Sequence, residues 1–500
     1  MKKQLFYGIA ISVFVMYSCS NDMEVVTPFE EGNVPNQQEP LTKAEINSAI
    51  DKALELNGRF DWSEASNHLL WSAVVRGENI LTVGYGNSEN AFQRQDSPGQ
   101  DKIKSDLLAT ISEAENWSEN NKKNQVFFED ETLTLLDVNV TSLETIERLR
   151  ESEGVRYLEP AGYRYFQNEQ AKGGGSGCGT EAEALNSNDY RTITPNAKVP
   201  WSFDIHNIPQ AWSYATGSGI TIGIVDTGIT PSNSLLGNAF NDGFSSGRFV
   251  QKYGTFVDSV WPWSSQTDGP NDQCGHGTSM ISVAVAPRND NGKPVGVAYN
   301  ANLVSYRAAS NVVLDGYHEQ RGVASAFTSL ANRSDVKIIS MSMGHIFSVG
   351  RIADAIRYAH SRGKLIFCAG GTSTSFTNFV GVIFPASMNE TVAVTGIEEG
   401  RYRECDTCHK GSKIDFTVSM ERDNNNHIPI LGFGENQTDY VGGSSVATAT
   451  TAGIAALVWS RNPSWNRTQV LNKLIQSAEF YPNRNGDFGW GNIDALKAVR

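Results

Sequence analysis

The spacing of hydrophobic positions separates a long C-terminal segment, in which apolar runs alternate with helical stretches, from a smaller mixed segment before it. Five uninterrupted apolar runs predict strands that are buried on both faces, at 220–225, 303–307, 337–343, 364–369 and 392–395. Helical spacing at 323–332 and 350–362 falls between these runs. The alternation predicts an α/β fold for residues 199–500, a three-layer sandwich around a mostly parallel central sheet.

The smaller segment, residues 44–166, contains both helical spacing of apolar residues and strand-like runs. Helical spacing covers 44–57, 103–114 and 143–151. Strand-like runs cover 69–75, 80–85, 125–140 and 155–158. Strand, helix, strands, helix, strand is the order of a split βαβ unit. We therefore expect a small α+β, ferredoxin-like domain in front of the large one.

Two stretches without periodicity flank the smaller domain. Residues 19–43 are polar and punctuated by proline, which predicts a tether. Residues 167–198 include Gly173-Gly-Gly-Ser-Gly177, so we expect a flexible linker that contains a maturation site.

The first 18 residues have the pattern of an export signal. Two lysines precede an apolar run from Leu5 to Met16 that is too short to span a bilayer comfortably. Cys19 directly follows Ser18, which resembles the lipoprotein box of bacteria and implies a lipid on Cys19; the alternative is an ordinary secretory signal with an incidental cysteine. The acidic stretch from Ser20 resembles the surface-export signal of Bacteroidetes lipoproteins. These resemblances imply a lipid-anchored protein of the cell envelope, on the outer-membrane surface.

Composition and charge exclude one class of partner. The chain has 500 residues with 41 basic and 55 acidic side chains, a formal net charge of −14. An acidic surface repels polyanions, so a nucleic-acid partner is not expected. The 46 glycines indicate many tight turns rather than disorder, because apolar residues are spread along nearly the whole chain.

Three short motifs place an acid, a base and a nucleophile at strand ends and helix starts. Asp226 follows the first buried strand, and His276 stands between two glycines, where an imidazole can accept a proton near neutral pH. Ser445 lies in Gly443-Ser-Ser-Val-Ala447, at the expected start of a helix whose free N–H groups favour developing negative charge. Each motif alone also fits a structural turn or a helix cap. The order Asp, His, Ser favours acyl transfer.

With these motifs in this order, residues 200–500 resemble the subtilisin-like serine peptidases. The resemblance implies that Ser445 is the nucleophile and an oxyanion donor through its backbone N–H, that His276 is the general base, and that Asp226 fixes the imidazole tautomer. It also implies that a protein or peptide substrate lies as an added strand near 307–309 and against Ser342, Met343 and Gly344.

The end of the smaller domain, 155–160, resembles the end of the inhibitory propeptide of the same family. The resemblance implies a zymogen in which residues 44–166 inhibit the catalytic domain. If the chain is cut between about 163 and 189, a lipid on Cys19 stays with the inhibitor, and we expect the catalytic domain to leave the membrane once the complex dissociates.

Gly371 departs from the family pattern. The family has asparagine at this position, and that side chain is the second oxyanion donor. Candidate substitutes are Thr372, Thr374, Asn378 or water. Ala449 also stands where the family usually has proline. Three outcomes are open: a slow enzyme, a donor from elsewhere, or a pseudoprotease that only binds proteins.

Five cysteines remain after Cys19, and their pairing cannot be derived from the sequence. We expect Cys368, at the end of a core strand, to be a free buried thiol. Cys405-Asp-Thr-Cys408-His409 matches a haem-attachment pattern and half of a zinc site, but a small local disulfide is favoured. The three catalytic groups require no cofactor. Structural calcium stays open, although Asn289–Gly292 fits an ordinary turn better than a calcium loop.

Overall fold

The computed structural model describes residues 39–94, 98–166, 178–371, 381–424 and 426–500, all within the unit formed by 37–500. The export signal, Cys19 and most of the expected tether lie outside the described residues, as do Gly173–Gly177, Thr372, Thr374 and Asn378. In the described ranges, no helix has the length and apolar character needed to cross a membrane.

A seven-stranded parallel sheet forms the centre of the larger domain, in the order β13-β12-β11-β10-β7-β9-β8. Its strands are β7 (Thr221–Asp226), β8 (Val250–Gly254), β9 (Asn302–Arg307), β10 (Val336–Met341), β11 (Leu365–Ala369), β12 (Val392–Glu398) and β13 (Phe416–Glu421). The predicted apolar runs form β7 and β9 to β12 and are buried on both faces, which confirms the α/β fold class. The edge strand β8 is only half-buried, so it gave no continuous apolar signal.

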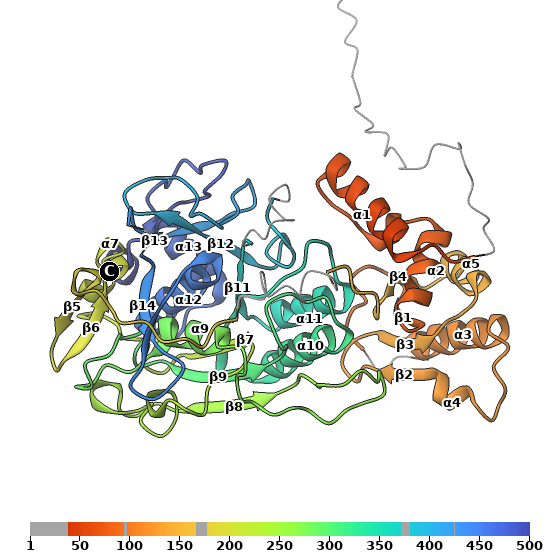
Figure 1. Cartoon of the computed structure of the whole chain (residues 1–500), viewed down its shortest axis with the longest axis horizontal. Helices are drawn as coiled ribbons and strands as arrows, with labels where there is room; N and C mark the ends of the chain where they lie inside the picture. The colour runs from red at the N-terminus through yellow and green to blue at the C-terminus, as the bar shows by residue number, and fades with distance from the viewer. Residues whose placement is uncertain (1–38, 95–97, 167–177, 372–380, 425) are drawn as a thin grey trace, which may run out of the picture. The chain divides into compact units, whose positions relative to one another are not determined.

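Helices cover both faces of this sheet (Figure 1). One face packs against α9 (His276–Val285), α12 (Gly443–Arg461) and α13 (Arg467–Ser477). The other face packs against α10 (Tyr317–Asn332) and α11 (Gly350–Ser361). The remaining elements are β5 (Tyr190–Ile193), β6 (Ala197–Pro200), α7 (Trp201–Ile205), α8 (Ile208–Ala211), β14 (Ile428–Leu431), β15 (Thr438–Val441) and α14 (Ala495–Val499).

The strand order reverses direction between β7 and β10. Strands β9 and β8 extend the sheet on one side of β7, whereas β10 to β13 extend it on the other. At such a reversal, the loops that leave the carboxyl ends of the two neighbouring strands diverge and open a crevice. Asp226 is the last residue of β7, and Ser342 directly follows β10. The fold therefore opens its crevice where the sequence places Asp226.

The smaller domain has a four-stranded antiparallel sheet in the order β2-β3-β1-β4. The strands are β1 (Ile80–Tyr85), β2 (Val126–Glu129), β3 (Leu135–Asn139) and β4 (Val155–Pro160). The helices are α1 (Lys43–Asn57), α2 (Asn67–Arg76), α3 (Pro98–Ala114), α4 (Lys122–Gln125) and α5 (Leu143–Glu151). From β1 onward, strand, α3, two strands, α5 and strand follow one another in split βαβ order.

The prediction of a strand at 69–75 was wrong, because this run forms α2. Ser66 caps the helix by accepting the Leu69 N–H at 3.2 Å. The buried Leu69 and Leu70 lie one turn before the buried Ala73 and Val74, so the spacing suits one helical face. An apolar run this short is compatible with either a helix or a strand, and the serine cap favours the helix.

Candidate active site

Asp226 and His276 form a buried hydrogen-bonded pair. The Asp226 Oδ1 and His276 Nδ1 atoms are 2.7 Å apart, and the side chains are 1% and 7% exposed. Asp226 is positioned by the end of β7, and His276 is the first residue of α9. Gly275, the residue before the helix, has φ of 92°, a conformation that glycine adopts without strain. Because a carboxylate only accepts, the proton is on Nδ1 and Nε2 is left as the base.

Asp272 holds the histidine loop in shape, a role the sequence did not reveal. Its Oδ1 accepts the N–H groups of Cys274 and Gly275, each at 2.9 Å, and the Thr227 hydroxyl at 2.9 Å. Its Oδ2 accepts the N–H of Thr278 at 2.9 Å and its hydroxyl at 2.7 Å. This buried carboxylate therefore ties the residues that follow Asp226 to both sides of His276. An acidic residue four positions before the histidine was the available signal.

The charges around His276 raise the pKa of its imidazole. Burial lowers this pKa, but the carboxylate of Asp226, by its charge and its hydrogen bond, and the charge of Asp272 outweigh burial, so the net pKa lies above the usual value of 6.5. A base with a pKa near neutrality suits proton transfer at physiological pH.

Ser445 lies in the first turn of α12, which begins at Gly443. Its backbone carbonyl accepts the Ser342 hydroxyl at 3.1 Å, and its own hydroxyl donates to the Ser342 carbonyl at 3.5 Å. Met341 pairs with Val225, so Ser342 lies beside the end of β7 that carries Asp226. The register therefore brings all three predicted groups to the carboxyl ends of the central strands β7 and β10. Within the described ranges, the Ser445 hydroxyl is not hydrogen-bonded to His276.

Residues 342–344, the segment predicted to pair with a substrate strand and called the substrate edge below, are already paired within the chain. The Gly344 N–H donates to Val312 O at 3.0 Å, and the Leu314 N–H donates to Gly344 O at 3.1 Å. Ser342 and Met343 are buried. A substrate strand that pairs with Gly344 has to displace this internal pairing.

Gly371 lies beside the serine helix but contributes no side chain. Its N–H donates to the Ser444 hydroxyl at 3.2 Å, and its φ is 129°. A Cβ placed on Gly371 would lie 3.0 Å from Cγ and 3.1 Å from Cε1 of His409, and closer still to Nδ1. The imidazole of His409 therefore occupies the space where the family has asparagine.

The described cysteines form two disulfides, Cys178–Cys274 and Cys405–Cys408. The second confirms the expected local disulfide, and Cys368 is a free buried thiol as predicted. Burial raises the pKa of that thiol, which keeps it unreactive. The first disulfide joins Cys178 to Cys274, and Cys274 lies two positions before His276 in the chain. In the described part of the chain, no three His, Cys, Asp or Glu side chains are grouped as metal ligands.

Residues 217–491, more than half of the chain, match the model of the Subtilase family. The chain belongs to the subtilase family. It is a subtilisin-like serine endopeptidase, and curated relatives agree with this assignment. A subtilisin of Bacillus sp. strain TA39 is 25% identical over 60% of this chain and 73% of its own length. Subtilisin BL of Lederbergia lenta is 28% identical over 60% of this chain and 99% of its own length.

A solved structure extends the likeness of the fold beyond the subtilase domain. The epidermin leader peptide processing serine protease of Staphylococcus aureus superposes with a TM-score of 0.58. The match covers 84% of this subtilase and 99% of that chain, at 15% identity. An identity this low supports the fold alone.

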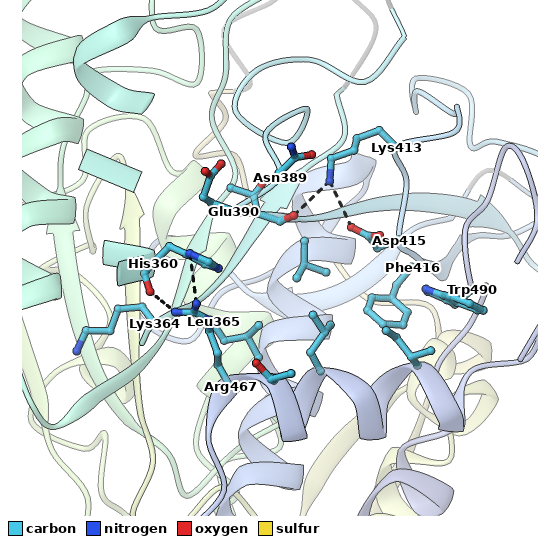
Figure 2. A pocket seen from close by; sticks show the side chains of 15 residues that line it. His360, Lys364, Leu365, Asn389, Glu390, Lys413, Asp415, Phe416, Arg467 and Trp490 are labelled. Carbon is cyan, nitrogen blue, oxygen red and sulfur yellow. Dashed lines mark hydrogen bonds and ion pairs between the residues drawn. The ribbon is translucent and has the colours of Figure 1, made fainter. Parts of the chain in front are cut away.

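A separate cavity of about 380 Å³ lies at the amino ends of strands β11 to β13 of the subtilase sheet (Figure 2). It is lined by Leu365, Val392 and Phe416, which begin β11, β12 and β13, whereas Asp226 ends its strand. Its basic groups already have partners: Lys413 lies 3.8 Å from Asp415, and Lys364 donates to Val336 O at 2.7 Å. We assign this cavity no part in the site described above.

Proposed function

We propose that this subtilase is an extracytoplasmic endopeptidase that hydrolyses peptide bonds through Asp226, His276 and Ser445. One observation carries the proposal: the buried 2.7 Å hydrogen bond between Asp226 and His276 lies at the carboxyl end of β7, and Ser445, in the first turn of α12, contacts Ser342 at the end of the neighbouring strand β10. The three residues also follow one another along the chain in the order Asp, His, Ser, which is the order of the family.

The reaction follows from the positions of these groups. The Ser445 hydroxyl turns from the Ser342 carbonyl to Nε2 of His276 and gives it a proton, while Oγ bonds to the substrate carbonyl carbon. The π pair of that carbonyl moves onto its oxygen, beside the N–H of Ser445. Asp226 stabilises the imidazolium. Nε2 then protonates the leaving amine as the C–N bond breaks, and water repeats the sequence on the acyl-enzyme.

Contacts of the smaller domain support the proposal that it is an inhibitory propeptide. Its last residues approach the segment that pairs with the substrate edge: the N–H groups of Tyr165 and Phe166 donate to the Asp315 carboxylate at 2.9 and 2.8 Å. The Phe166 ring also packs against His345, next to Gly344. A tail held there lies next to the substrate edge.

Buried polar and ionic contacts join the two domains. Both oxygens of Glu159 accept the Gly350 N–H at the start of α11, at 2.8 and 2.9 Å. Arg156 binds Asp354 through two hydrogen bonds, and Arg351 is paired with Asp137. Removal of one partner from such a pair costs several kcal/mol, because the other charge is left buried and unpaired. We propose that the protein is made as a zymogen and is anchored through a lipid on Cys19, with the catalytic domain outside the cytoplasm.

A fluorophosphonate probe tests the catalytic assignment. We expect stoichiometric labelling of the matured protein, no labelling of Ser445→Ala, and a fall in peptide turnover of about 10⁶-fold, the size of loss that removal of this serine causes in subtilisin. Ser444→Ala is the matched control and should still be labelled, because it removes the neighbouring hydroxyl and leaves that of Ser445 in place. Wild type that stays unlabelled after maturation, or Ser445→Ala that is labelled, would contradict the proposal.

A further inference from the structure

We propose that His409 supplies the second oxyanion donor of this enzyme through its Nδ1–H, in place of the asparagine that the family has at Gly371. The inference rests on the proposed function of Ser445 and adds a residue to it. His409 comes from the loop that follows the Cys405–Cys408 disulfide, far from the position where the family pattern places the donor.

The first argument is position. Nδ1 is the His409 atom nearest to a Cβ placed on Gly371. The ring of His409 and an asparagine side chain at Gly371 would therefore compete for the same space. Gly371 has no Cβ, and its φ of 129° is one that side chains rarely adopt. The glycine and the histidine therefore form a matched pair, in which the missing side chain makes room for the ring.

The second argument is the location of the proton. Nδ1 of His409 lies 2.8 Å from Gly381 O. A carbonyl only accepts, so Nδ1 carries the hydrogen. Nε2 is buried and has no hydrogen-bond partner among the described residues. Burial lowers the pKa of His409, which keeps the ring neutral with Nδ1 as its one donor.

The third argument is preorganisation. The backbone of His409 is fixed at both ends: its N–H donates to Gly371 O at 3.1 Å, and its carbonyl accepts the Thr395 hydroxyl at 2.5 Å. Gly371 in turn donates to Ser444, the neighbour of the nucleophile. With the side chain 5% exposed, water does not compete for the ring. A donor held in this way stabilises developing charge without reorganising during the reaction.

The Gly381 carbonyl does not prevent this role. It is a neutral acceptor, whereas the tetrahedral intermediate carries a full negative charge on oxygen. Hydrogen bonds to ionised acceptors are roughly twice as strong as those between neutral groups. The fixed N–H therefore shares its hydrogen between Gly381 O and the oxyanion in a three-centre bond, without movement of the ring.

Substitutions that move or remove the N–H test the proposal. The side-chain nitrogen of asparagine can take the place of Nδ1, whereas that of glutamine reaches the place of Nε2. We expect His409→Asn to retain kcat within about tenfold. His409→Gln and His409→Ala should lose about 10²- to 10³-fold in kcat, the size of effect when one such donor is removed from subtilisin, with KM little changed.

A transition-state analogue separates an oxyanion role from a structural one. A peptide aldehyde forms a hemiacetal with Ser445 whose oxygen takes the oxyanion position, while the matching peptide alcohol only occupies the ground-state site. We expect His409→Ala to weaken aldehyde binding by at least about 10²-fold and alcohol binding by less than about threefold. Equal weakening of both inhibitors would assign His409 to scaffolding and overturn the proposal.

Two further outcomes distinguish failure of the oxyanion role of His409 from failure of the proposed peptidase function. Wild-type labelling by fluorophosphonate with unchanged kcat in His409→Ala would overturn the inference and leave the peptidase intact. Absence of wild-type labelling would overturn both. Melting curves of each variant, recorded in a Ser445→Ala background to prevent self-digestion, show whether a loss of rate follows from a loss of folding. A folded His409→Asn as slow as folded His409→Gln would also contradict the proposal.

Discussion

The aspartate–histidine side of the site and the serine side are built in different ways. On the first side, Asp226 and Asp272 hold His276 through hydrogen bonds that come from two short segments, 226–227 and 272–278. On the second side, the hydroxyl of Ser445 has one distant acceptor, and the donor missing at Gly371 has to come from another part of the chain. The base is therefore held by many short hydrogen bonds between two segments, whereas the oxyanion site depends on single contacts between several loops.

This difference has an energetic meaning. Loss of a buried acceptor such as Asp272 leaves several donors unpaired at once, so the base side should respond to mutation in both folding and chemistry. The serine side should respond mainly in the chemical step, because its groups act on charge that exists only during the reaction. The predictions below test that contrast.

Apart from removal of the nucleophile itself, the largest effect is expected for Asp226→Asn. The amide keeps the shape of the side chain but favours the wrong imidazole tautomer, with Nδ1 as acceptor and Nε2 protonated, so the base is lost. We expect kcat to fall by about 10⁴-fold, as in the equivalent substitution in a chymotrypsin-like triad, with little change in KM. Steady-state hydrolysis of a peptide substrate measures both. A loss no larger than that of His409→Ala would remove the contrast between the two sides.

Asp272→Asn should lower stability more than any substitution on the serine side. Its amide nitrogen cannot accept from the Thr278 N–H or from the backbone donors of Cys274 and Gly275, so at least one buried donor loses its partner. We expect the free energy of unfolding to fall by about 2–4 kcal/mol, since each unpaired buried group costs about 1–3 kcal/mol.

Urea unfolding in the Ser445→Ala background measures this change. The exposed Asp258→Asn is the matched control and should stay within about 0.5 kcal/mol of the parent. If Asp272→Asn and the control unfold at the same urea concentration, Asp272 does not hold the loop in the way described.

The smallest effect is a shift of the pH profile. His276 has to be neutral to accept a proton, and its pKa is raised above 6.5. The value of kcat/KM should therefore rise with pH through an inflection above 6.5. Asp272 is one of the charges that raise this pKa, so Asp272→Asn should move the inflection to lower pH. An inflection that stays in place would show that Asp226 alone sets the pKa.

The sequence predicted five of the seven strands of the central sheet, β7 and β9 to β12, because their burial on both faces leaves a continuous apolar signal. Strand β13 is also buried, but its apolar residues alternate with Thr417, Ser419 and Glu421, so it left no such run. The half-buried β8 left no such signal, and α2 fitted both periods until its serine cap was seen. Short apolar runs are ambiguous because packing, rather than local spacing, decides between helix and strand.

The candidate catalytic residues were predictable because each lies in a short glycine-containing motif whose backbone demands leave a trace in the sequence. His409 left none. It meets Gly371 only through the fold, and the sequence showed the empty position without showing what fills it. The structural role of Asp272 was missed for a related reason. An isolated acidic residue in a loop is usually solvated, so nothing in the sequence indicated that this carboxylate is buried and accepts several hydrogen bonds.

The Cys178–Cys274 disulfide decides what proteolysis of the linker can achieve. A cut before Cys178 separates the N-terminal domain from everything that follows, and only noncovalent contacts then hold the two pieces together. A cut anywhere between residues 179 and 273 leaves a nicked protein whose fragments stay covalently joined. Such a molecule runs as one band on a gel until a thiol reductant is added, and any lipid at the front of the chain would then still hold the peptidase at the membrane.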